Sequence, residues 1–112
     1  MVRGHEKLVM RQYDICRNVN PASRKQVPFV VILQADLLND FHTVVVAPLM
    51  TESVSTKMTR LNPSVKVLGR TYRVSTAELA AVLRKQLGEV VANVEAQHGE
   101  FVAAIDLLFT GI

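Results

Sequence analysis

The chain of 112 residues has no tryptophan and a single cysteine, Cys16. One cysteine cannot form an internal disulfide, so a packed core must hold the fold, and a reducing, cytoplasmic location is expected. No apolar run reaches the roughly 18–20 residues of a membrane-spanning helix. The first ten residues lack the apolar centre of a signal peptide. These absences predict a cytoplasmic protein with no membrane partner.

The excess of positive over negative charge is also small. Lysine and arginine number 13 and aspartate and glutamate 10, which gives a net charge of +3. The basic residues are scattered, with adjacent pairs only at Arg24-Lys25 and Arg84-Lys85, and neither pair has an aromatic residue beside it. Nucleic-acid binding calls for a denser basic patch. A solvated basic surface is therefore the favoured interpretation, and no direct sequence-specific nucleic-acid partner is expected.

Residues that carry catalytic chemistry are sparse. His5, His42 and His98 are isolated in the sequence, so no metal site is expected. The five glycines match no phosphate-binding loop, so no cofactor is expected either. Cys16 lies on a predicted strand, which favours a buried inert thiol over a nucleophile assisted by His42 or His98. The pattern favours a protein that acts by binding and is not an enzyme.

A metal-free ribonuclease remains an open alternative. Such an enzyme needs a general acid or base and a cation beside the phosphate. His42, Arg70 and Arg73 could supply these groups if the fold brought them together. Solvated arginines beside a strand are the competing interpretation for Arg70 and Arg73.

Length and a hydrophobic content of 49% predict one domain. Residues 1–9 look like an extension outside the fold, and residues 10–112 form the predicted domain. Alternating or β-branched runs predict three strands and then a hairpin, at residues 12–17, 27–33, 43–49 and 65–74.

Three local features refine this strand prediction. Pro48 is expected at the end or an edge of the third strand, because proline lacks a ladder donor. Leu37 and Leu38 lie in a turn that presents apolar surface, and residues 51–59 form a polar loop. The hairpin turns at Leu68-Gly69-Arg70.

The segment after the hairpin is ambiguous. Ser75-Thr76-Ala77-Glu78 matches a capping box, and the propensity of residues 79–87 then favours a helix ended by Gly88. Residues 81–83 would suit a strand equally well. A further short element follows at residues 89–93.

The last segment carries a clear helical stripe. Phe101, Ile105, Leu108 and Ile112 follow a spacing of 4, 3 and 4, and Gly111 stands where a helix C-terminal glycine is expected. The stripe allows two interpretations: Ile112 packs into the core, or the end of the helix is a functional tip. Strands first and one principal helix last predict a mainly β fold, an antiparallel α+β domain or small barrel.

Four stretches resemble the CcdB toxins of bacterial toxin–antitoxin pairs, at residues 13–18, 28–38, 44–49 and 104–112. The resemblance runs from about Met10 to Ile112. It implies an SH3-like barrel or antiparallel sheet of the CcdB/MazF type with a C-terminal helix, forming a homodimer. It also implies that the helix tips bind the DNA gyrase A subunit and trap its cleaved-DNA complex. A CcdA-like antitoxin would wrap the toxin with a disordered tail and neutralise it.

The resemblance also implies particular site residues. Asp106, Thr110, Gly111 and Ile112 match the gyrase-binding tip. Thr110 stands where the best-known members have tryptophan, and an indole can bury about 150–250 Å² as an anchor whereas threonine cannot. A homologue that binds antitoxin but no longer poisons gyrase is therefore a further alternative.

Two further pairs complete the predicted site. Leu37 and Leu38 match an apolar pair in the region engaged by gyrase and antitoxin. Apolar area remaining on Phe109 and Ile112 is what a symmetric dimer would cover.

Overall fold

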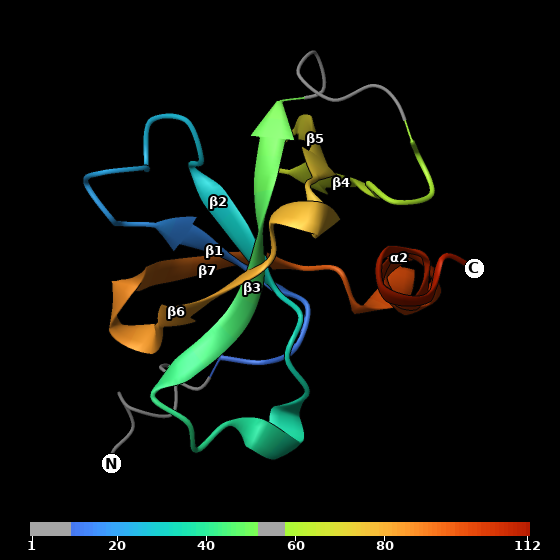
Figure 1. Cartoon of the computed structure of the whole chain (residues 1–112). Helices are drawn as coiled ribbons and strands as arrows, with labels where there is room; N and C mark the ends of the chain where they lie inside the picture. The colour runs from blue at the N-terminus through green and yellow to red at the C-terminus, as the bar shows by residue number, and fades with distance from the viewer. Residues whose placement is uncertain (1–9, 52–57) are drawn as a thin grey trace.

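The structure is a computed structural model that describes residues 10–51 and 58–112. The predicted extension at 1–9 and most of the predicted loop at 51–59 lie outside the described residues. Figure 1 shows a curled sheet with one α-helix to its side. The strands are β1 (Asp14–Asn18), β2 (Phe29–Ile32), β3 (Thr43–Thr51), β4 (Ser64–Val67), β5 (Arg70–Val74), β6 (Ala80–Leu83) and β7 (Leu87–Asn93), and the helix is α2 (His98–Thr110). Short 3-10 turns are η1 (Asp36–Leu38), η3 (Thr76–Glu78), η4 (Arg84–Gln86) and η5 (Glu95–Gln97).

The strands form one antiparallel sheet in the order β4-β5-β3-β2-β1-β7, with β6 also paired to β3. The sheet curls into a half-barrel, and α2 follows the last strand. The mainly β fold with a C-terminal helix, predicted from the sequence, is confirmed.

Successive side chains of each strand point to opposite faces of the sheet, and this divides the core into two clusters. One cluster includes Ile15, Val31 and Leu49 and extends to Phe101 of α2. The other lies on the opposite sheet face and consists of Cys16, Val30, Ile32, Val44, Val46 and Leu87. Burial, with a smaller effect of the Asp14 charge, raises the pKa of the Cys16 thiol to about 12. Cys16 is thus a buried core residue that stays a thiol at neutral pH.

Pro48 lies inside β3, which has neighbouring strands on both sides, so the prediction that it marks the end or an edge of the strand is wrong. Leu33 N donates to Val45 O, so alternation turns the backbone groups of residue 48 away from β2. On that other edge Ser75 N donates to the Pro48 carbonyl at 2.9 Å, and the chain then leaves β3 to form η3. The missing N–H of Pro48 therefore falls where β3 changes its neighbour from β6 to β5.

The helix predicted for residues 79–87 is wrong, and the strand alternative is what the structure shows. Ser75 makes no side-chain cap, and only the single turn η3 follows it. Residues 80–83 instead pair with residues 46–43 of β3. Pairing with a valine-rich strand outweighs the helix propensity of alanine and leucine, a weak local preference.

Gly88 lies within β7 and does not end a helix. A Cβ at this position would lie 2.7 Å from Val19 Cγ1 and 3.3 Å from the Arg17 carbonyl oxygen, so a larger residue would require the neighbouring segment to shift.

The predicted hairpin is confirmed as β4 and β5. Its two turn residues, Leu68 and Gly69, have φ of 51° and 83°, as a type I′ turn requires. Leucine is poorly suited to this left-handed conformation, and its side chain is 64% exposed.

We predict that Leu68→Asn stabilises the protein by about 1 kcal/mol, because asparagine tolerates the left-handed region better than leucine. The measurement is the urea unfolding midpoint. Gly69→Ala is the opposite control and should lower the midpoint. An unchanged or lower midpoint for Leu68→Asn would contradict the prediction.

Candidate functional site

Helix α2 is buried on one face and ends in exposed apolar residues. Phe101 and Ala104 are fully buried, and Ile105 packs against the larger core cluster. Gly111 adopts a left-handed φ of 78°, and its N–H donates to Leu107 O at 3.0 Å. No atom lies within 4 Å of a Cβ built on Gly111, so the backbone conformation, not space, selects glycine here.

Beyond this cap the apolar stripe leaves the core. Ile112 is 83% exposed and Phe109 is 68% exposed. The interpretation that Ile112 packs into the core of this chain is therefore wrong. Exposed apolar residues at one helix end are typical of a surface that a partner covers.

The polar residues of the tip give it a distinct charge. Asp106 and Thr110 are both exposed, and Thr110 Oγ1 donates to the Asp106 carbonyl at 2.6 Å. The Thr110 hydroxyl is thus used inside the helix. The last turn of α2 has no basic residue. The Asp106 carboxylate therefore adds to the negative end of the helix dipole, which favours a cationic partner.

Leu38 and Phe109 come together although 71 positions separate them in the sequence. Both line an apolar cavity of about 380 Å³ between η1, β3 and α2. Its other lining residues are Leu33, Gln34, Ala35, Val45, Leu79 and Ile105. Leu37 does not line this cavity and is 91% exposed on η1. The turn presents apolar surface, as expected, and Leu38 shares this cavity with Phe109 at the end of α2.

Tyr13 holds the other end of α2, a role that the sequence did not reveal. Its hydroxyl lies 2.6 Å from His98 Nδ1, and its ring contacts the His98 and Phe101 rings with centroids 5.4 and 5.3 Å away. Its N–H donates to Ile32 O and its carbonyl accepts from Val94 N. The positive φ of 69° at Tyr13 is unusual for a bulky residue and marks a position that these contacts hold.

We predict that stability falls as pH rises above about 10. Burial, and secondarily the Glu95 charge, raises the pKa of Tyr13 in the folded state. A raised phenol pKa contributes stability that is complete below the unfolded pKa and is lost as pH rises through the folded pKa. Tyr13→Phe should cost about 1 kcal/mol at pH 7 through the lost hydrogen bond and should reduce this alkaline loss.

Thermal unfolding of both proteins between pH 7 and 11 measures this effect. Tyr72→Phe serves as a second phenol control, because no side-chain hydrogen bond to its hydroxyl is found among the described residues. An alkaline loss of equal size in Tyr13→Phe and the unsubstituted protein would show that Tyr13 is not the group responsible.

The residues of the ribonuclease alternative are not brought together. His42 lies just before β3, in a cavity of about 390 Å³ lined by Phe41, Leu83, Arg84 and Lys85. Arg73 pairs with Met50 near the far end of β3 and donates to Asn62 O at 3.1 Å. Eight residues of strand place His42 and Arg73 roughly 20 Å or more apart. The Arg70 guanidinium lies 5.8 Å from the Tyr72 ring centroid.

Metal and membrane signals are also lacking in the part of the chain that the structure describes. Within residues 10–51 and 58–112, no group of three or more histidine, cysteine or acidic side chains could hold a metal ion. No helix formed by these residues is long and apolar enough to cross a bilayer.

Comparison with protein families decides the relationship. The family described as CcdB protein matches residues 12–111. The chain belongs to the CcdB family. A search of curated protein sequences finds no match.

Solved structures that share this fold include toxins and endoribonucleases, among them the toxin MazF-mt6. An endoribonuclease in complex with its cognate antitoxin, from a mycobacterial species, has a TM-score of 0.71 at 13% identity, over 88% of this chain and 93% of that one. The Mycobacterium tuberculosis toxin MazF-mt6 has a TM-score of 0.67 at 19% identity, over 88% and 96%. A further Mtb toxin has a TM-score of 0.64 at 22% identity, over 74% and 92%.

The CcdB family match and the toxin neighbours support a toxin of a toxin–antitoxin system, with an antitoxin as partner. Membership of the CcdB family suggests a toxin without catalysis, while the structural neighbours include endoribonucleases. At these identities the neighbours establish the fold. Whether the chain is an enzyme therefore depends on its own side chains.

Proposed function

We propose that this CcdB-family chain inhibits DNA gyrase by binding the gyrase A subunit through the end of α2 and trapping the cleaved-DNA complex. The carrying observation is the exposed tip, where Phe109 and Ile112 extend past the packed part of the helix. Gly111 turns the chain at this point. Asp106 and the negative end of the helix dipole supply attraction for a basic surface on gyrase.

A homodimer is part of this proposal. Phe109 and Ile112 are exposed in the single chain, and a two-fold interface would cover part of this apolar area and place two tips side by side.

Leu37 and Leu38 on η1 would add the surface where gyrase and a CcdA-like antitoxin with a disordered tail compete. The cavity that Leu38 and Phe109 line together supports such competition, because one partner bound there would block the other. A toxin that acts on gyrase in this way works in the cytoplasm.

An endoribonuclease is the second candidate, favoured by the fold that this chain shares with endoribonucleases. The separation of His42 from Arg73 along β3 speaks against the catalytic group considered above. A third candidate is a homologue that binds antitoxin but not gyrase, because Thr110 offers no aromatic anchor.

One pair of assays separates the first two candidates. Purified protein at micromolar dimer should inhibit supercoiling by gyrase and leave cleaved DNA trapped on the enzyme. The same preparation should leave single-stranded RNA intact in the presence of a chelator. Cleavage of RNA that is lost in Arg73→Ala or His42→Ala would favour the ribonuclease. Normal supercoiling without trapped DNA would overturn the gyrase proposal.

A further inference from the structure

Strand β6 has one hydrogen-bonded neighbour among the described residues and leaves its other edge open. Arg84 N donates to His42 O, so the pairs Thr43–Leu83 and Val45–Ala81 are not the hydrogen-bonded ones. The N–H and C=O of Ala81 and the N–H of Leu83 therefore point away from β3. No partner for these three groups is present in residues 10–51 and 58–112, and both residues are exposed.

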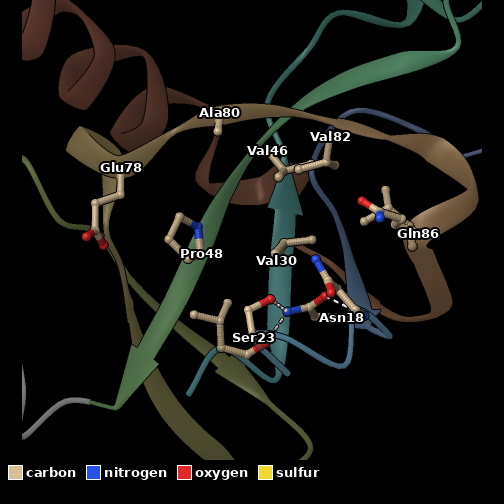
Figure 2. A pocket seen from close by; sticks show the side chains of 12 residues that line it. Asn18, Ser23, Val30, Val46, Pro48, Glu78, Ala80, Val82 and Gln86 are labelled. Carbon is tan, nitrogen blue, oxygen red and sulfur yellow. Dashed lines mark hydrogen bonds between the residues drawn. The ribbon is translucent and has the colours of Figure 1, made fainter. Parts of the chain in front are cut away.

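A cavity of about 320 Å³ lies on the sheet face next to this edge. Figure 2 shows Ala80 and Val82 of β6 on one side of it, Asn18 and Ser23 on the other, and Val30 between them. The apolar lining consists of Val27, Val30, Val46, Pro48, Ala80, Val82 and Leu87. A cavity of this size and composition suits an apolar side chain or a small ligand.

The polar lining argues against a phosphate-bearing ligand. No lysine, arginine or histidine lines the cavity, and its single charged lining residue is Glu78. Asn18 is already committed, because its amide nitrogen donates to Ser23 Oγ and Val27 O. The side-chain amides of Asn20 and Gln86, which also line the cavity, can bond to a peptide backbone.

The two ends of β6 carry side chains of opposite charge. Glu78 precedes β6, and Lys85 follows it with an exposed side chain. A strand beside β6 would meet a carboxylate at one end and an ammonium group at the other. A fitting segment therefore has a basic residue near Glu78, an acidic residue near Lys85 and an apolar residue between them.

We propose that the open edge of β6 takes up an extended segment of the antitoxin as an additional strand, with one apolar side chain of that segment in the cavity. Main-chain bonds to Ala81 and Leu83 would supply affinity, and the cavity would supply specificity. Side chains of an added strand alternate in step with those of β6, so those beside Ala80 and Val82 reach the cavity face. This inference rests on the toxin–antitoxin pairing and not on the binding of gyrase.

Hydrogen exchange of the full chain tests the added strand directly. The probe is the full-length antitoxin that we expect the reading frame adjoining that of this chain to encode. Its binding should slow exchange at the Ala81 and Leu83 amides by roughly tenfold or more. Val82 is the internal control, because its amide faces β3 and should be slow in both states.

Two matched pairs of variants test the edge and the cavity. Ala81→Pro removes an outward N–H without removing a ladder bond and should weaken antitoxin binding roughly tenfold or more, whereas Ala81→Ser should not. Ala80→Phe should weaken antitoxin binding by filling the cavity. Ala81→Phe adds the same ring on the opposite face and should leave antitoxin binding unchanged. Inhibition of gyrase should be equal in all of these variants.

The proposal is overturned if the adjoining antitoxin binds without protecting Ala81, or does not bind at all. It is also overturned if Ala81→Pro and Ala80→Phe, folded by circular dichroism, bind as the unsubstituted protein does. Protection of Ala81 that appears when the chain alone is concentrated would assign the edge to a second copy instead. If the unsubstituted protein does not inhibit gyrase but the antitoxin still protects the Ala81 amide, the gyrase proposal is refuted and this one stands.

Discussion

Removal of Gly111 and Ile112 is expected to abolish inhibition of gyrase supercoiling, with the inhibitory concentration rising roughly 100-fold or more. The reason is the position of Ile112, which is 83% exposed in the single chain, so the part of it that a two-fold interface leaves uncovered would be buried only on gyrase. Complete burial of an isoleucine side chain contributes about 1.5–3 kcal/mol, and the truncation also removes the left-handed cap that directs it. The measurement is supercoiling of relaxed plasmid across a concentration series.

The fold of the truncated protein should persist, because Phe101, Ala104 and Ile105 fasten α2 to the sheet upstream of the deletion. Val102→Ala is the matched control, since Val102 is also an exposed apolar residue of α2 but lies at its beginning. This variant should inhibit gyrase as the unsubstituted chain does. Full inhibition by a folded truncated protein would remove the tip from the mechanism.

Replacement of Thr110 by tryptophan is expected to strengthen gyrase inhibition about tenfold or more. Thr110 is exposed on the tip, so an indole can be added without disturbing the core. It would give the tip the large apolar anchor that interface hot spots favour. The hydrogen bond from Thr110 to the Asp106 carbonyl is lost, at a small cost to an exposed helix end. The measurements are supercoiling in vitro and growth of cells that express the variant.

Thr110→Ala is the companion control and should not gain potency, because it removes the hydroxyl without adding apolar area. The same pair separates the remaining alternatives. If the unsubstituted chain is inactive and Thr110→Trp restores toxicity, the chain is a homologue that lost its anchor. A folded Thr110→Trp protein that leaves gyrase unaffected would refute the assignment of this tip to gyrase.

Sequence patterns predicted the elements whose signal is local. The β-branched runs at β2 and β3, and Gly69 in the β4–β5 turn, define strands and a hairpin without reference to the rest of the chain. The apolar spacing of α2 and its terminal Gly111 are equally local. The prediction for the segment at β6 was wrong because its alanines and leucines favour a helix. The valines that pair with it and make it a strand lie some 35 residues earlier, in β3.

The candidate site was predictable only in part, for a similar reason. The stripe of α2 defines one apolar face, but it does not show where the sheet beneath the helix ends. Phe101 and Ile112 therefore look alike in sequence and differ fully in burial. The contact of Tyr13 with His98 joins positions 85 residues apart, and no periodic pattern marks it.

The pairing of β1 with β7 has a consequence for the order of folding. This pairing and the Tyr13–His98 contact close loops of 79 and 85 residues. Long loops of this kind slow folding towards the range of milliseconds to seconds, because their closure entropy is lost before the contacts stabilise the chain. The β4–β5 hairpin can form early, whereas the start of α2 is fastened only when the pairing of β1 with β7 brings Tyr13 to His98. We therefore expect the exposed tip to become rigid only in the last kinetic phase.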